Sequence, residues 1–242
     1  MKELKKEEID SEYYNEHIFS ADSRFDFMKD LKSPFQKYRV QKVLQIYTPK
    51  KNEAVLDLGC GWGTFCFALA PICKHVTGLD YSRNSIKLCK KLSKKYPYKN
   101  IDFVLADARN TGLKSESYDV IISADLFEHL YPQMFEETLD ECRRLLKKGG
   151  KLVIWTPHRG YILEILKNNN IILKKDLSHV DYKSMPRLLD TLGKRHFQIR
   201  KSYYAESHVP IALTIEKILL PFLPLMRRRI AILAEKTDQK VN

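Results

Sequence analysis

The fold of this chain is decided by Val55-Leu56-Asp57-Leu58-Gly59-Cys60-Gly61-Trp62-Gly63-Thr64-Phe65. An apolar run ends on an acidic residue, and three glycines at alternate positions follow. Glycine is favoured where the backbone turns sharply, adopts a positive φ or lets a ligand approach closely. The pattern predicts a strand, a tight loop and a helix, whose N-terminus offers unpaired N–H groups to a ligand. Such a loop suits a polar cofactor that contains adenosine.

The glycine spacing distinguishes this loop from a dinucleotide-binding loop. Dinucleotide sites use G-x-G-x-x-G and hold a pyrophosphate at the helix end. Here Gly63 comes one position early, and Asp57 precedes Gly59 by two residues, where its carboxylate would repel pyrophosphate and attract an ammonium group. The pattern D-x-G-x-G-x-G resembles motif I of the class I S-adenosylmethionine-dependent methyltransferases. The resemblance implies that Asp57, Gly59, Gly61 and Gly63 bind S-adenosylmethionine around its methionine part.

Further acidic residues follow the next predicted strands. Residues 75–79 lead into Asp80, 21 positions after Gly59, which fits the acidic residue that binds a ribose in nucleotide folds. Two adjacent hydroxyls can donate to one carboxylate. The resemblance implies that Tyr81 lies against the adenine and that an acidic residue after the third strand accepts from its amino group. The remaining predicted cofactor residues follow strands 101–105 and 118–123: Asp107, Ala108 and Asp125.

Each of these carboxylates also has a simpler structural interpretation. Asp57 is placed to cap the next helix, Asp80 with Ser82 is placed to start one, and Asp107 stands near a turn at Asn110. Their order and spacing taken together favour the cofactor site.

The alternation of strands and helices from 55 to 155 predicts a doubly wound parallel sheet. The resemblance implies a Rossmann-like α/β fold with seven mostly parallel strands, helices on both faces and an antiparallel last strand at 229–234. We expect a fifth strand at 151–155, and a helix at 188–192 that Gly193 caps before a strand at 196–199. We expect residues 1–50 to form a helical cap over the active site and 51–242 the methyltransferase domain, with an apolar insertion at about 205–228.

Composition indicates one soluble globular domain. The chain has 242 residues, 44% hydrophobic and 30% charged. Its N-terminus is charged, which argues against a signal peptide. Five scattered cysteines without C-x-x-C indicate neither a zinc site nor a disulfide framework, so we expect no metal and a reducing, cytoplasmic location.

Two basic features leave alternatives open. The net charge of +12 gathers partly after Asp80, on Lys87, Lys90, Lys91, Lys94, Lys95 and Lys99. A solvated helix face is favoured over a nucleic-acid or anionic membrane footprint, because aromatics are not interleaved. The apolar run 209–226, followed by three arginines, is too short and interrupted to span a bilayer. It suits packing on the sheet edge, a substrate lid, a dimer contact or peripheral contact with the inner membrane surface through 209–229.

Methyl transfer from a sulfonium is an in-line displacement that depends mainly on alignment. A hydroxyl acceptor must also lose a proton, which histidine can take near neutral pH. We expect His129, just beyond the fourth strand, to be the general base, with His158 second; capping of the next helix is the alternative for Glu128-His129. The predicted substrate contacts are Tyr14, Phe19, Arg159 and His179.

Missing motifs narrow the acceptor. The chain lacks an N-P-P-Y-like sequence after strand four, a Pro-Cys nucleophile and a paired-glutamate loop. We therefore expect methylation, mainly at oxygen, of a small-molecule, lipid-precursor or glycan acceptor, which includes amphipathic acceptors. The quinone-biosynthesis O-methyltransferases are similar in the region after residue 179. The alternatives are a tRNA or rRNA methyltransferase that uses the Lys-rich surface, and a non-catalytic regulator that binds the cofactor. The oligomeric state is not predicted.

Overall fold

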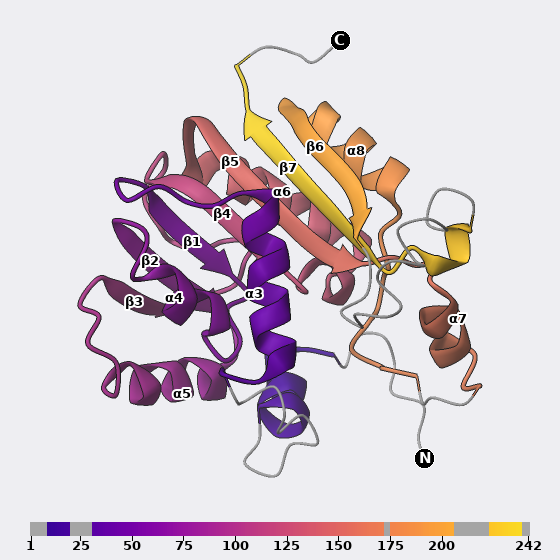
Figure 1. Ribbon diagram of the computed structural model, residues 1–242, viewed down its shortest axis with the longest axis horizontal. Helices are drawn as coiled ribbons and strands as arrows, with labels where there is room; N and C mark the ends of the chain where they lie inside the picture. The colour runs from indigo at the N-terminus through magenta and orange to yellow at the C-terminus, as the bar shows by residue number, and fades with distance from the viewer. Residues whose placement is uncertain (1–8, 20–30, 172–174, 206–222, 239–242) are drawn as a thin grey trace.

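A single seven-stranded sheet of order β3-β2-β1-β4-β5-β7-β6 runs through the centre of the computed structural model (Figure 1). The structure describes residues 9–19, 31–171, 175–205 and 223–238. Strands β1 to β5 pair in parallel, whereas β7 is antiparallel to both of its neighbours. The predicted fold is confirmed. The strands are β1 Ala54–Leu58, β2 His75–Asp80, β3 Ile101–Leu105, β4 Tyr118–Ala124, β5 Leu146–Pro157, β6 Phe197–Ala205 and β7 Arg229–Lys236.

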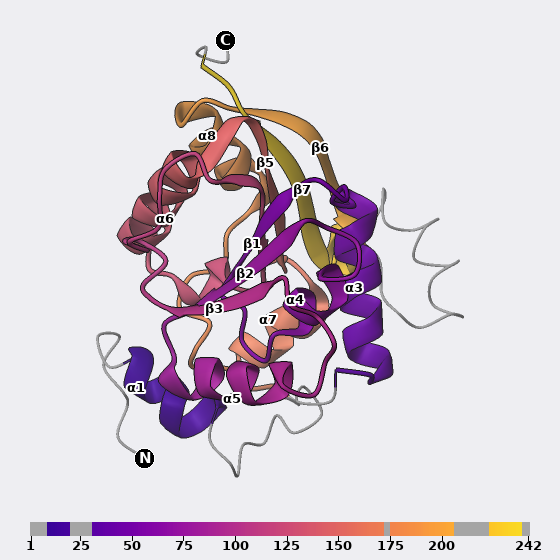
Figure 2. The ribbon, with the colours of Figure 1, turned by 90° about the vertical axis from the view of Figure 1, so that its left-hand side faces the viewer.

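Helices cover both faces of the sheet. Figure 2 shows α3 (Pro34–Ile46) and α4 (Thr64–Leu69) on one side, and α6 (Pro132–Leu145) and α8 (Met185–Lys194) on the other. Helix α5 (Arg83–Ser93) packs with α4 in the first layer. The shorter elements are α1 (Ser11–Tyr13), a π-helical turn (Tyr14–Ile18), α7 (Ile162–Asn168) and 3₁₀ turns at Phe127–His129 and Pro224–Met226.

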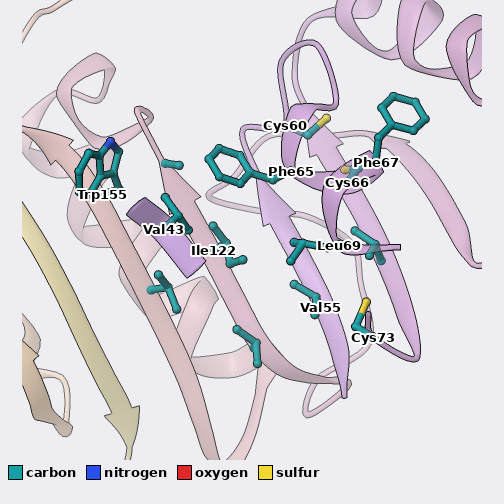
Figure 3. Close-up of a cluster of buried hydrophobic side chains, with 14 of the residues drawn as sticks. Val43, Val55, Cys60, Phe65, Cys66, Phe67, Leu69, Cys73, Ile122 and Trp155 are labelled. Atoms are coloured by element: carbon teal, nitrogen blue, oxygen red, sulfur yellow. The ribbon is translucent and has the colours of Figure 1, made fainter. Parts of the chain in front are cut away.

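The core consists of two apolar layers, one on each face. Successive side chains of a strand point to opposite faces, so Val55 and Ile122 lie in one layer while Leu56 and Ile121 lie in the other. The first layer is closed by side chains from α3 and α4, among them Val43, and by Trp155 of β5 (Figure 3). Both layers pack against the central strands, which are therefore apolar on both sides.

The structure corrects three local predictions. Strand β5 begins at Leu146, before the glycine pair, and its pairing with β4 shifts between Tyr118 and Val120. Gly193 lies inside α8 and does not cap it; the chain reverses at His196, which has a φ of 57°. Helix α5 ends at Ser93, so the last three lysines of the basic run lie beyond it. Pairing and turn geometry set these ends, and composition alone does not determine them.

The predicted apolar insertion, about 205–228, falls almost entirely on residues outside the described ranges. Only its ends are described: Ala205, at the end of β6, and 223–228, which lead through the 3₁₀ turn Pro224–Met226 into β7. Within the part of the chain that the structure describes, no helix combines the length and apolar character needed to cross a membrane.

Candidate active site

A cavity of about 260 Å³ opens at the carboxyl ends of β1, β2 and β4. Four chain segments form most of its wall, namely 59–62, 79–81, 106–108 and 124–130. Residues from far away in the sequence complete it: Ile9, Tyr14, Ile18, Phe19, Arg39, Ser178, His179 and Arg229. Ligands of open α/β sheets bind at this edge, where helix directions diverge and strand ends leave a crevice.

The glycine loop forms one end of the cavity. Gly59, Gly61 and Gly63 all have positive φ values, of 75°, 50° and 76°. Gly59 and Gly61 line the cavity, whereas Gly63 is not among the lining residues. A Cβ on Gly63 would approach the ring of Phe67 to 2.9 Å, so this glycine lets α4 begin close to its neighbours. Gly63 thus has a packing role in this structure, and its cofactor role stays a prediction.

Asp57 lies beneath the loop rather than in the cavity wall. Its side chain is 1% exposed, and Oδ2 accepts a hydrogen bond from Cys66 Sγ at 3.2 Å. Burial, aided by the nearby Cys60 thiol, raises the pKa of Asp57 to about 8. At neutral pH this carboxyl group is mostly protonated. It therefore offers little of the negative charge that was expected to attract the ammonium group of a ligand.

Asp80 is the carboxylate that faces the cavity at this end. Its Oδ2 accepts from the backbone N–H of Gly61 and its Oδ1 from that of Ser82, both at 2.9 Å. These bonds fix the side chain against the glycine loop. Burial and the Cys60 thiol raise the pKa of Asp80 to about 7, although the two N–H groups stabilise its charged form. Deprotonated Asp80 has lone pairs left to accept from ligand hydroxyls.

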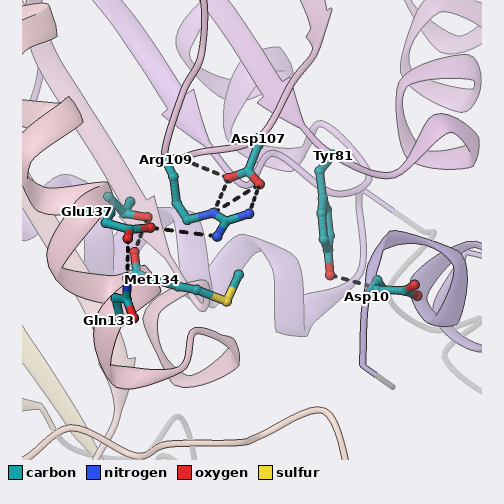
Figure 4. Close-up of polar contacts among 8 residues, drawn as sticks. Asp10, Tyr81, Asp107, Arg109, Gln133, Met134 and Glu137 are labelled. Carbon is teal, nitrogen blue, oxygen red and sulfur yellow. Dashed lines mark hydrogen bonds and ion pairs between the residues drawn. The ribbon is translucent and has the colours of Figure 1, made fainter. Parts of the chain in front are cut away.

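Tyr81, Asp107 and Ala108 line the neighbouring wall. Tyr81 donates its hydroxyl proton to Asp10 O at 3.3 Å, and Asp107 accepts from Arg109 Nε and Nη2 at 3.0 and 2.7 Å (Figure 4). Burial alone would raise the pKa of Asp107, but Arg109 outweighs it and lowers that pKa. An adenine amino group would therefore share this carboxylate with Arg109, a partner that the sequence prediction did not include.

The other end of the cavity contains two histidines in defined tautomers. His129 Nδ1 lies 2.8 Å from the carbonyl oxygen of Ser178, which only accepts, so Nδ1 carries the proton. His179 Nδ1 lies 2.6 Å from Tyr182 Oη, and that hydroxyl donates its own proton to Glu164 at 2.7 Å. In both neutral rings Nε2 is left with the lone pair. The rings pack edge to face, with centroids 4.8 Å apart.

Tyr14 closes the cavity over His129. Its ring lies edge-on to His129 with centroids 5.7 Å apart, and it also contacts Tyr81 and Phe19. The Tyr14 hydroxyl is buried and has no hydrogen-bond partner among the described residues. A buried polar group without a partner costs free energy, so this hydroxyl marks a position where a ligand would supply one.

Asp125 forms part of the cavity wall between the two ends. It adopts a φ of 59°, which is uncommon for a non-glycine residue and recurs at functional sites. Arg39 binds its Oδ2 through Nε at 2.9 Å and Nη2 at 2.7 Å, and Arg229 binds its Oδ1. Burial alone would raise the pKa of Asp125, but Arg229 and Arg39 outweigh it and lower that pKa. Both oxygens are thus engaged by side chains before any cofactor binds.

His158 and Arg159 are not brought into the cavity wall. His158 Nδ1 bonds to Arg227 O at 2.9 Å and its ring packs on Tyr204. Arg159 lines a separate surface pocket, which it shares with His179 and Tyr182. The structure therefore gives His129 and His179 a place at the cavity and leaves His158 and Arg159 outside it.

Sequence reasoning missed the residues that stabilise Asp125 and the turn at His129. Arg39 lies on the buried face of α3, which also contains the polar residues Gln36 and Lys42, so the helix has no apolar stripe on which Arg39 would stand out. Lys183 is fully buried and donates to the carbonyl oxygens of Phe127, Leu130 and Asp181. It fixes the 3₁₀ turn that carries Glu128 and His129. No local sequence pattern indicated that role.

Comparison with known proteins agrees with this geometry. Residues 56–154 match a family model described as a methyltransferase domain. A sphingolipid C9-methyltransferase of Candida albicans is 35% identical over 43% of this chain and 22% of its own length. A ubiquinone biosynthesis O-methyltransferase of Coxiella burnetii is 32% identical over 46% of each chain. The crystal structure of a SAM-dependent methyltransferase from Archaeoglobus fulgidus superposes with a TM-score of 0.66 at 20% identity, covering 89% of this chain and 100% of that one.

The chain carries, over residues 56–154, a methyltransferase domain of the class I S-adenosylmethionine-dependent type. It spans less than half the length of the two curated relatives. The family implies S-adenosylmethionine, and the cavity fits it: glycine backbone at one end, a carboxylate at Asp80, aromatic and apolar walls, and an unpartnered hydroxyl at Tyr14. Asp80, Tyr81, Asp107 and Ala108 line the cavity, and their role in holding the adenosine part stays a prediction.

Proposed function

We propose that this chain transfers a methyl group from S-adenosylmethionine to a small-molecule or lipid-precursor acceptor, at an oxygen atom. The observation that carries the proposal is one continuous cavity lined by both the glycine loop with Asp80 and the pair His129 and His179. The proposed cofactor site and the two imidazole rings would therefore share one cavity. When bound, S-adenosylmethionine supplies an activated methyl group.

The residues of the chain would orient the acceptor and accept its proton. His129 Nε2 has a lone pair because Ser178 holds Nδ1–H, so the ring is oriented as a base. Lys183 and the Ser178 carbonyl restrain the turn and the ring, which limits the cost of aligning the reactants. Tyr14 would exclude water from this end and could donate or accept a hydrogen bond through its hydroxyl.

The cavity wall supports an acceptor with an apolar part. Phe19, Phe35, Leu126, Leu130 and Met134 all contribute to it. Such a wall favours an aromatic or acyl group, with a few polar groups fixing orientation. Because the N-terminal residues Ile9 to Phe19 form part of the same wall, we also propose that this segment caps the site when ligand is bound.

Calorimetric titration with S-adenosylmethionine and S-adenosylhomocysteine tests the proposal first. We expect micromolar binding by the folded protein, followed by methyl incorporation from labelled cofactor into one class among phenols, lipids and glycans. Absence of cofactor binding by a folded protein would overturn the proposal. Transfer to tRNA or rRNA alone would overturn the proposed acceptor class.

A further inference from the structure

Glu128, His129 and His179 form a compact group of metal-ligand side chains at the acceptor end of the cavity. One ligand atom from each residue lies within 4.8 Å of the other two. Across the described ranges no second group of three such residues is this close. Two of the three come from the 3₁₀ turn after β4 and the third from a segment about fifty residues later, so only the fold brings them together.

The Nδ1–H group of each histidine makes the kind of hydrogen bond that metal-bound histidines make through the ring nitrogen that does not bind the metal. A ligating imidazole usually donates its other N–H to a carbonyl or carboxylate, which fixes the tautomer and orients the ring. His129 donates Nδ1–H to the Ser178 carbonyl. His179 donates Nδ1–H to Tyr182, which in turn donates to the carboxylate of Glu164. Each ring therefore keeps its Nε2 lone pair for a further ligand.

Glu128 supplies a buried carboxylate whose charge lacks a dedicated counterpart. Its side chain is 1% exposed, and Oε2 accepts one hydrogen bond from Thr156 Oγ1 at 2.9 Å. The nearby arginines, Arg39 and Arg229, form their ion pairs with Asp125. Burying an ionised carboxylate is costly unless it is paired or binds a metal.

We propose that Glu128, His129 and His179 bind a divalent transition-metal cation of the zinc type. Two histidines and one glutamate with a further position open are a donor set of catalytic zinc sites. Tetrahedral ligands around zinc lie roughly 3.3 Å apart, so the three ligand atoms, now within 4.8 Å of one another, would approach by at most about 1.5 Å on binding. Because His129 and His179 line the cavity, the open position would face the acceptor.

The proposal gives the cation a role in acceptor binding, and that role alone rests on the proposed function. A bound cation lowers the pKa of an oxygen ligand. It would therefore select acceptors with a hydroxyl or carboxyl oxygen near the methylated atom. In the cation-bound protein His129 Nε2 is a ligand and no longer the general base.

Titration with Co²⁺ alone, after removal of adventitious metal with a chelator, tests the site directly. We expect one equivalent of Co²⁺ to bind with the visible absorption of a tetrahedral nitrogen and oxygen site. Glu128→Gln, His129→Asn and His179→Asn should each weaken binding by about 100-fold or more. The control His75→Asn removes a histidine that pairs with Asp102 on the surface, and it should leave binding unchanged.

Tyr182→Phe provides a finer test, because it removes only the acceptor of His179 Nδ1–H. We expect Co²⁺ affinity to fall about tenfold, as for other outer-shell partners. Failure of the folded wild type to bind Co²⁺ would overturn the proposal. So would thiolate-to-cobalt charge transfer, or binding retained in all three ligand variants. S-adenosylhomocysteine titration of the same samples reports separately on the proposed methyltransferase function.

Discussion

The two ends of the cavity are built in different ways. At the cofactor end, Asp80 and the glycine loop lie within 25 residues of Asp57 in the chain and are held by backbone N–H groups. At the acceptor end, Asp125, His129 and His179 are held by side chains and carbonyls from distant segments. The first end is a local motif completed by secondary structure. The second exists only after the whole sheet has formed.

This difference concerns electrostatics as well as assembly. Backbone N–H groups at the cofactor end favour the charged form of Asp80 and present the same geometry whatever the side chains around them. At the acceptor end, Arg39 and Arg229 neutralise Asp125, while Glu128 stays buried without its own cation. Removal of one side chain at the acceptor end should therefore leave a buried charge without its partner. Removal of one side chain at the cofactor end should remove only one hydrogen-bonding site.

The largest expected effect separates the two ends completely. His129→Asn should lower the methyl-transfer rate by about 10²–10⁴-fold, whether His129 takes the acceptor proton itself or holds the proposed cation that acidifies the acceptor. S-adenosylhomocysteine affinity should change by less than about twofold, because Asp80 and the loop remain intact. Rate assays with the acceptor found by screening, paired with calorimetry, measure both. An equal loss of cofactor affinity would show that the two ends are not independent.

Asp80→Ala should weaken cofactor binding, the property that His129→Asn is expected to leave unchanged. Hydrogen bonds to a charged group contribute about 1.5–3 kcal/mol each, so cofactor affinity should fall roughly 100-fold. Asp102→Ala is the matched control, since Asp102 is an exposed aspartate on the adjacent strand β3. Calorimetric titration of both variants measures the difference. Unchanged affinity in Asp80→Ala would remove Asp80 from the cofactor site.

Two glycines at similar φ values distinguish backbone strain from packing. Gly63→Ala meets both a φ of 76° and a contact of 2.9 Å with Phe67, so unfolding free energy should fall by about 2–3 kcal/mol. Gly149→Ala has a φ of 68° in open space and should cost about 1 kcal/mol. Denaturant unfolding compares them. Equal losses would mean that close packing at α4 does not explain the third glycine.

The smallest effect is a dependence of cofactor affinity on pH. Asp80 has a pKa of about 7 in the free protein, and its deprotonated form accepts from the cofactor hydroxyls. Lowering the pH from 8 to 6 should therefore weaken S-adenosylhomocysteine binding about tenfold. Asp80→Asn should bind weakly with little dependence on pH. A slope that persists in Asp80→Asn would instead point to Asp57, which titrates near pH 8.

The sequence predicted the fold and much of the cofactor end. Strands β1, β2 and β4 lie where apolar runs predicted them, because a buried parallel strand must be apolar on both faces. Asp80 follows from spacing, since a strand–loop–helix unit has a nearly fixed length. The ends of α8 and β5 were predicted less well, because His196 and the glycine pair take their conformations from strand pairing.

At the acceptor end the sequence identified residue types but not their neighbours. It ranked His129 first and His158 second as the general base and gave His179 only as a substrate contact, yet of these three His129 and His179 line the cavity and His158 does not. It did not indicate that Arg39 and Arg229 would occupy Asp125, or that Lys183 would support the turn at His129. Each of these contacts joins residues far apart in the chain, and such pairs leave no local periodicity.

By itself, then, the sequence determined the sheet, the glycine loop and the position of Asp80 beside that loop, because short-range geometry and strand burial dictate them. The tertiary structure alone decided which histidines meet, which tautomers they adopt and which charges remain unpaired. The physical reason is that hydrogen bonds and Coulomb interactions depend on distances of a few ångström. Those distances, for residues such as Glu128 and His179, are set only when distant segments pack against one sheet.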